Sequence, residues 1–470
     1  KTREQPTIMT ETPRPNIIVI MADDLGYGDL ACYGQTRYAT PHLDRMAEEG
    51  ARFTQFNSPC PVCAPSRAAL FTGRYPLRCG LIENPTPDGK ERCDAMALPE
   101  TEITIADLFR SAGYATGMIG KWHLGHRQPE FLPIHRGFDE YRGIPYSNDM
   151  RPVQLLNGAE RETHPVDQTT LSRDYTEWCQ DFITRHRERP FFLHYAPAAP
   201  HKPLSVSAEY DGKTGAGLYG DTVAELDASV GKLLDHLRTT GLAENTLVLF
   251  TSDHGPWFGG NTGGLRGMKA STFEGGFRVP MIAWWPGQIP AATEIATPTI
   301  TTDLFSTALQ AAGIETPPDR VIDGCDLLPL MRGETTRRET EFIFGQTDRG
   351  TMTVRDAHWK LHLQQPWAFK SLAPGAPYTE RKPHDGKTII APGKQYHPSD
   401  YPGMETGDEP RVGMLFDLRN DPAEQHDVSA DYLDEVKRLQ AAAAAMDWRD
   451  TASAHVVDPP LVPVDQKISR

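Results

Sequence analysis

The sequence predicts an α/β fold: a large, mostly parallel sheet sandwiched by helices, followed by a smaller C-terminal antiparallel sheet with a helix. Three observations support this prediction. Four apolar runs have the length of strands, helical patterns lie between them, and the chain changes to short runs after about residue 335. We therefore predict a main α/β domain over residues 1–335 and a smaller α+β domain over residues 336–470.

Each predicted strand of the large sheet ends in a cluster of polar residues. The strands lie in NIIVIMADD (16–24), YATGMIGKWH (114–123), RPFFLHYAPAAPH (189–201) and TLVLFTSDHG (246–255). In open parallel sheets, ligands bind outside the carboxyl ends of the strands. The four polar clusters are therefore expected to meet at one edge of the sheet.

The helical patterns between these strands are amphipathic. The clearest is DTVAELDASVGKLLDHLRTTG, which Gly241 ends and which has an apolar stripe at helical spacing: Val223, Leu226, Val230, Leu233, Leu234 and Leu237. A second helix is predicted from Thr104 to Ala112. In the C-terminal part, EFIFGQ, TMTVRDAHWKLHL and GMLFDLRNDP predict strands, and residues 431–446 predict a helix.

The composition is typical of a globular protein and limits the possible partners. Of 470 residues, 39% are hydrophobic, the mean hydropathy is −0.49, and no run reaches the roughly 18 to 20 apolar residues of a membrane span. A net charge of −15 argues against a nucleic-acid partner, which would need a basic face. The polar N-terminus lacks the apolar core of a signal peptide, and a native start at Met9 would indicate the cytoplasm.

Carboxylates gather at two of the predicted strand ends. Asp23 and Asp24 end the first strand, and Asp253 and His254 end the last one. An Asp pair alone is usually a helix cap or a turn, but three converging carboxylates would repel one another unless a cation were bound. The oxygens suit Ca²⁺ or Mg²⁺, whereas His254 is a softer ligand that leaves the identity of the metal open.

Cationic and imidazole groups follow the other predicted strand ends. Lys121 and His123 lie two residues apart, His201 follows a proline-rich strand end, and Lys269 lies in a glycine-flanked loop. Each of these alone is typical of a surface. Together, around an acidic metal site, they indicate an anionic oxygen substrate that bridges the metal and the lysines.

Two cysteines precede a helical run in CPVCAPSRAALFTGR. Pro65 suits the first turn of a helix, so Cys63 is predicted at a helix N-terminus, where backbone amides favour negative charge and nucleophilic character. Cys60 has no such setting and is interpreted as structural.

The pattern Cys63, Pro65, Ser66, Arg67, Thr72, Gly73 and Arg74 resembles the signature of type I sulfatases. The resemblance extends from about Asn16 to LFDLRNDPAEQHDV near the C-terminus. Within the family, GKWHLGHRQPEFLPIHRGFDEYRGIPYSND and GDTVAELDASVGKLLDHL are similar to arylsulfatase A and N-acetylgalactosamine-6-sulfatase. The resemblance implies an alkaline-phosphatase-like fold and hydrolysis of a sulfate monoester of an aryl group or a sugar.

The resemblance also implies the cofactors and the roles of the site residues. A maturation enzyme would oxidise Cys63 to formylglycine, and Ca²⁺ would be held by Asp23, Asp24, Asp253 and His254. The sulfate would be surrounded by Lys121, His123, His201 and Lys269, with Arg67 supporting the hydrate of residue 63. Many members have asparagine where His254 stands, which puts the fourth ligand in doubt. The family favours a periplasmic or secreted enzyme that acts on a sulfated small molecule or carbohydrate.

Two other functions stay open on the sequence. The same metal and lysine arrangement could hydrolyse phosphate or phosphonate esters, or the chain could be an inactive protein that binds sulfated glycans. Phosphate release exceeding sulfate release would favour the first, and tight binding without turnover the second. The walls of the substrate pocket are predicted in residues 126–136, 148–156, 257–266 and 367–378.

Overall fold

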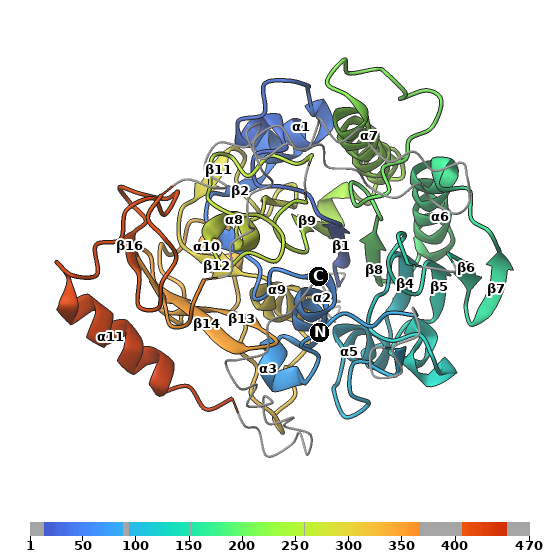
Figure 1. Ribbon diagram of the computed structural model, residues 1–470. Helices are drawn as coiled ribbons and strands as arrows, with labels where there is room; N and C mark the ends of the chain where they lie inside the picture. The colour runs from blue at the N-terminus through green and yellow to red at the C-terminus, as the bar shows by residue number, and fades with distance from the viewer. Residues whose placement is uncertain (1–13, 88–93, 151–152, 258, 367–406, 449–470) are drawn as a thin grey trace, which may run out of the picture.

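A ten-stranded mixed sheet forms the centre of the protein (Figure 1). The computed structural model describes residues 14–87, 94–150, 153–257, 259–366 and 407–448. The strands follow the order β11-β2-β10-β9-β1-β8-β4-β5-β6-β7. The four predicted strands are neighbours in its parallel central block: β9 (Thr246–Ser252), β1 (Asn16–Ala22), β8 (Phe191–Ala196) and β4 (Ala115–Gly120).

The strands outside this block are partly antiparallel. On one side lie β10 (Met281–Trp284), β2 (Ala51–Phe53) and β11 (Thr293–Ile295), and on the other β5 (Glu140–Gly143), β6 (Leu155–Asn157) and β7 (Glu160–Thr163). Of these, β10 is antiparallel to both β9 and β2, and β6 is antiparallel to both β5 and β7. The predicted mostly parallel sheet is confirmed, and its antiparallel pairings lie outside the central block.

Helices cover both faces of the sheet because successive side chains of each buried strand point to opposite faces. In β1, Ile17 and Val19 join the core on one face, and Ile18 and Ile20 join the core on the other. The first face is covered by α2 (Cys63–Thr72), α5 (Ile105–Ser111) and α9 (Thr302–Ala312). The second is covered by α1 (Pro41–Glu49), α6 (Leu171–His186) and α7 (Leu218–Thr239).

A small antiparallel sheet follows the main one, as the sequence predicts. Its strands are β13 (Ile343–Thr347), β14 (Gly350–Arg355), β15 (Trp359–His362) and β16 (Leu415–Asp417), and α11 (Leu433–Ala444) packs on it. Ile343, Val354 and Leu439 share a small core with Tyr75 and Ile300 of the main part. The predicted domain boundary after residue 335 stays a prediction.

Short elements complete the fold. The remaining helices are α3 (Pro76–Cys79), α8 (Glu274–Phe277), α10 (Leu328–Met331) and the 3₁₀ turns η1 (Ala31–Tyr33), η2 (Pro129–Phe131), η3 (Pro133–His135), η4 (Gln168–Thr170) and η5 (Ala243–Asn245). A separate two-stranded sheet pairs β3 (Phe56–Asn57) with β12 (Thr299–Ile300). Within the described residues, no helix has the length and apolar character needed to cross a membrane.

A buried network of charges joins the two sheets. Glu274, at the start of α8, accepts hydrogen bonds from Arg278 Nη2 (2.6 Å) and Arg355 Nη1 (2.8 Å). The ammonium of Lys360 on β15 lies 3.1 Å from Glu274 Oε1 and 3.2 Å from the carboxylate of Glu424. Because all five side chains are at most 8% exposed, the network fixes α8 against the small sheet in a low-dielectric interior.

Candidate active site

Acidic side chains from two neighbouring strands meet at the carboxyl edge of the sheet. Asp23 and Asp24 directly follow β1, and Asp253 and His254 directly follow β9. The backbone amide of Asp24 donates to Asp253 Oδ1 (3.1 Å), which joins the two strand ends. All four residues are at most 1% exposed. Carboxylates at this burial need cationic partners.

Three cations supply part of this compensation. Lys121, which follows β4, donates from Nζ to Asp23 Oδ2 at 2.7 Å, and Lys269 donates to Asp24 Oδ1 at 2.7 Å. Arg67, one turn into α2, donates from Nη2 to Asp253 Oδ2 at 2.9 Å. The three cations therefore approach the carboxylates from three separate segments of the chain.

Cys63 is the first residue of α2 and lies within this cluster. Its Sγ is 3.2 Å from His254 Nε2 and 3.8 Å from Asp23 Oδ1. Burial alone would raise the pKa of the Cys63 thiol, but Lys121 and Lys269 lower it below its ordinary value. The predicted helix N-terminus is confirmed. This position favours an anionic, nucleophilic group at residue 63.

Two further imidazoles are held in defined orientations. His201 Nδ1 faces two acceptors, Asn148 Oδ1 at 2.9 Å and the Lys202 carbonyl at 2.5 Å, so Nδ1 carries the proton and Nε2 faces Asp24 Oδ2 at 3.7 Å. His123 Nε2 lies 3.1 Å from the Pro85 carbonyl and donates to it. His123 Nδ1 is buried and has no hydrogen-bond partner within the described residues, so it is available as an acceptor.

Backbone strain is concentrated at the same site. Asp24, His123 and Ala270, which follows Lys269, have φ values of 62°, 64° and 69°. Non-glycine residues in this region cost of order 1 to 3 kcal/mol and persist where the surroundings fix them. These strained backbone conformations therefore lower the stability of the fold, and they orient the side chains of the site.

Two groups of side chains lie close enough together to hold a cation. The candidate ligand atoms of Asp23, Asp24, Cys63 and His201 lie within 4.8 Å of one another, and so do those of Cys63, Asp253 and His254. His254 Nδ1 donates to the Gly255 carbonyl at 2.8 Å, which leaves Nε2 facing Asp24 Oδ1 at 3.5 Å. Burial lowers the pKa of His254, but the negative charge of Asp253, Cys63 and Asp24 raises it to about 9. Negative charge concentrated in this way favours a cation in place of that proton.

The comparisons with known proteins agree with this geometry. A family model for sulfatases matches residues 15–314. The chain belongs to the sulfatase family. It is 37% identical over 462 residues to N-acetylgalactosamine-6-sulfatase of Canis lupus familiaris, a match that covers 90% of this chain and 84% of that protein. It is also 37% identical to arylsulfatase A of Bos taurus, with coverage of 92% and 88%.

Solved structures of similar fold extend the comparison. A structure from a study of glycosaminoglycan metabolism by Bacteroides thetaiotaomicron matches with a TM-score of 0.74 at 25% identity, covering 92% of this chain and 99% of that one. The protein Ps i-CgsB, solved with a neocarrahexaose, matches with a TM-score of 0.74 at 27% identity, covering 92% of each chain. This sulfatase is therefore a sulfuric ester hydrolase with the alkaline-phosphatase-like fold of its family. Family membership implies a metal and a formylglycine.

All ten residues predicted from the sequence lie in this one cluster. They are Asp23, Asp24, Cys63, Arg67, Lys121, His123, His201, Asp253, His254 and Lys269, and the individual roles given to them stay predictions. Ser66 Oγ donates to the Asp253 carbonyl. Ser66 belongs to the cysteine motif, but the motif alone did not predict this contact.

Two further contacts had no sequence signal. Asn84 Oδ1 accepts a hydrogen bond from the Ala64 amide at 2.8 Å, and Ser147 Oγ accepts one from Lys121 Nζ at 3.2 Å. Of the predicted pocket walls, residues 148–156 contribute Asn148 to the site, whereas residues 367–378 lie outside the described residues.

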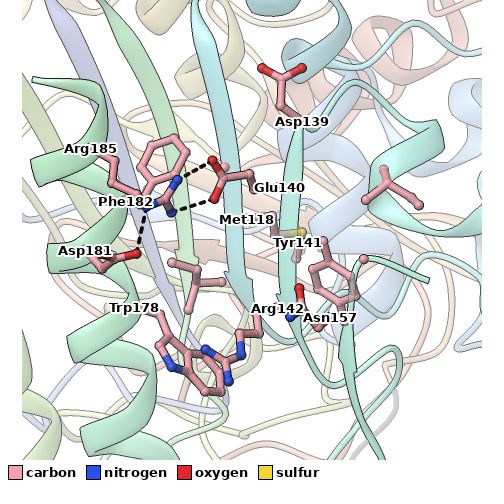
Figure 2. A pocket seen from close by; sticks show the side chains of 14 residues that line it. Met118, Asp139, Glu140, Tyr141, Arg142, Asn157, Trp178, Asp181, Phe182 and Arg185 are labelled. Carbon is pink, nitrogen blue, oxygen red and sulfur yellow. Dashed lines mark hydrogen bonds and ion pairs between the residues drawn. The ribbon is translucent and has the colours of Figure 1, made fainter. Parts of the chain in front are cut away.

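A cavity of about 310 Å³ between β5 and α6 is separate from this cluster, because none of the ten site residues lines it (Figure 2). Arg185 donates to both Glu140 and Asp181 (Figure 2). Arg142 stacks on Trp178, with Cζ 3.6 Å from the ring centroid, and also pairs with a carboxylate. The arginines that line this cavity are therefore already neutralised, which does not favour a sulfate there.

Proposed function

We propose that the enzyme hydrolyses the sulfate ester of a sugar or an aryl alcohol, with residue 63 as the nucleophile after its conversion to formylglycine. The observation that carries the proposal is the position of Cys63 at the start of α2, 3.2 Å from His254 and among Asp23, Lys121 and Lys269. A reacting group on residue 63 would lie beside both cations and carboxylates. Sulfated carbohydrates are the favoured substrates, since the similar protein Ps i-CgsB was solved with a neocarrahexaose and a relative at 37% identity is an N-acetylgalactosamine-6-sulfatase.

Calcium is the proposed metal, with Asp23, Asp24, Asp253 and His254 as its ligands. The three carboxylates supply the oxygen donors that Ca²⁺ prefers, and the hydrogen bond from His254 Nδ1 to Gly255 turns Nε2 toward the carboxylates, where the ion would replace the proton on Nε2. When bound, the ion supplies positive charge that stabilises the sulfate oxygens as charge develops on them.

The chain's own cations would hold the sulfate. Lys121 and Lys269 now donate to Asp23 and Asp24, and their three ammonium protons allow each of them to bind a sulfate oxygen as well. Formylglycine supplies the nucleophilic hydroxyl as its hydrate. Arg67 supports this region through Asp253 and lies 3.4 Å from Asp23 Oδ1.

Two histidines would move the protons. His201, when both of its ring nitrogens carry a proton, would give the proton on Nε2 to the departing alcohol oxygen as the bond from sulfur to that oxygen breaks, and its Nδ1 stays fixed by Asn148. His123 would accept the proton that residue 63 gives up when sulfate leaves. Burial and the nearby Lys121 lower the pKa of His123 well below its ordinary value, so the ring is neutral and can act as a base.

Two cysteine variants test the proposal. Cys63→Ala removes the precursor of the nucleophile, so we expect sulfate release from 4-nitrophenyl sulfate to fall to background. Cys60→Ala is the matched control, because Cys60 is equally buried and three residues away but outside the cluster. We expect it to keep its activity. Full sulfate release by Cys63→Ala protein would contradict the proposal.

The rate of phosphate release distinguishes this function from phosphate ester hydrolysis. The wild-type protein should release sulfate faster than phosphate from matched 4-nitrophenyl esters; the reverse would assign the site to phosphate ester hydrolysis.

We also propose that the enzyme works in the periplasm or outside the cell, where it would meet polymeric sulfated glycans. Fractionation of the native host tests this proposal.

A further inference from the structure

A cavity of about 330 Å³ is lined by the residues that precede Cys63 and follow Lys269 in the sequence. Val62, which caps α2 before Cys63, and Ala270, which follows Lys269, both line it. The amide of Ala270 donates to the Pro61 carbonyl at 2.7 Å, so these two segments are in contact at the base of the cavity. A group attached to a sulfate between Cys63 and Lys269 would extend into this space.

The far wall of the cavity is the tip of the β13–β14 hairpin. Thr347, Asp348 and Arg349 line it, and Asp348 and Arg349 are exposed. Gln346 fixes the hairpin to the main part: its amide donates to the Pro59 carbonyl at 2.8 Å, and its Oε1 accepts from the Leu77 amide at 3.0 Å. The small sheet therefore completes a wall beside a nucleophile that belongs to the main sheet.

The chemistry of the lining is mixed rather than cationic. Asp348 and Glu83 contribute carboxylates, Arg349 contributes one guanidinium, and Val62 and Met352 contribute apolar surface. Asp348 and Arg349 form no ion pair within the described part of the chain. Carboxylate and guanidinium groups hydrogen-bond hydroxyls, and apolar side chains pack on the C–H face of a sugar ring. The exposed carboxylate of Asp348 would repel a second sulfate in this cavity.

We infer that this cavity binds the sugar of a singly sulfated saccharide, and that Asp348 and Arg349 are specificity-determining residues that hydrogen-bond its hydroxyl groups. The inference rests on the proposed function of residue 63. It assigns recognition of the alcohol to the small C-terminal sheet and chemistry at the sulfur to the main one.

The test compares two substrates in matched variants. Asp348→Ala and Arg349→Ala should each lower kcat/KM for N-acetylgalactosamine 6-sulfate roughly tenfold, mainly through KM, and change kcat/KM for 4-nitrophenyl sulfate by less than about twofold. Arg337→Ala, an exposed arginine outside the cavity, is the control and should change neither. Unchanged kinetics on the sugar in both variants, or an equal loss on both substrates, would overturn the inference.

Binding measurements separate this inference from the proposed function. In a Cys63→Ala background that cannot turn over, calorimetry with the same sugar sulfate should show weaker binding once Asp348 is also replaced. A disulfated monosaccharide should bind with a higher Kd than the monosulfated one. The ratio of the two Kd values should become smaller in Asp348→Asn protein, because the variant lacks the carboxylate that repels the second sulfate. Wild-type protein that hydrolyses neither substrate refutes the proposed function, whereas tighter binding of the disulfated sugar refutes the inference.

Discussion

Cys60 and Cys63 are both buried, and their surroundings give the two thiols opposite acidities. Burial raises the pKa of Cys60 far above its ordinary value, and a backbone hydrogen bond at Val62 lowers the pKa much less than burial raises it. For Cys63, Lys121 and Lys269 outweigh the same penalty and lower the pKa. A spacing of three residues thus separates an inert thiol from an activated one, because only Cys63 lies at the helix terminus facing the lysines.

The proposed proton donor for the leaving group is also a single residue, His201. His201→Ala should lower kcat for a sugar sulfate by roughly 10²- to 10⁴-fold, the usual contribution of a general acid. The loss should be smaller for 4-nitrophenyl sulfate, because its leaving group departs as a stable anion without a proton. Steady-state kinetics on both substrates check this. Equal losses on the two substrates would show that His201 does not protonate the leaving group.

At the scale of elements, four adjacent parallel strands bring the site together, and a buried charge network fixes the loop that carries Lys269. Glu274 begins α8 five residues after Lys269 and pairs with Arg278, Arg355 and Lys360. Burial alone would raise the pKa of Glu274, but Arg355, Lys360 and Arg278 lower it far below its ordinary value of 4.5. Glu274 is therefore ionised in the folded protein at neutral pH.

Glu274→Gln should destabilise the protein by about 3 to 5 kcal/mol near pH 7, since it leaves buried cations unpaired. Because folding lowers the pKa of Glu274, the ionised carboxylate stabilises the folded protein fully above pH 4.5, and this stabilisation is lost as the pH falls toward the lowered pKa. In thermal unfolding, the melting temperature of the variant should therefore be lower than that of the wild type near pH 7, and this difference should become smaller below pH 4.5.

The control for this prediction is Glu294→Gln, which breaks an exposed pair with Arg52. It should cost no more than about 1 kcal/mol, as is usual for surface pairs. A difference between wild type and Glu274→Gln that grows as the pH falls would contradict the account of the network.

At the scale of the whole molecule, the sequence predicted those parts of the fold that have a regular hydrophobic pattern or a specific motif. Apolar runs predicted the four central strands, and the cysteine motif predicted the start of α2. The order of the strands was not predictable, because pairing between β1 and β9 joins residues that are 230 apart in sequence. Asn84, which contacts α2, and the hairpin tip at Asp348, which lines the neighbouring cavity, were missed for the same reason: tertiary packing places them there, and they have no local pattern.

The proposed modification of residue 63 concerns all three scales, because the motif surrounds this residue in the sequence, α2 places it at a helix terminus, and Lys121 and Lys269 act on it there. The most direct test is mass spectrometry of the peptide containing residue 63, on protein that was co-expressed with a formylglycine-generating enzyme and that releases sulfate. The account predicts an aldehyde at residue 63 in the active fraction, and an unmodified cysteine at residue 60. A thiol at residue 63 in fully active protein would contradict it.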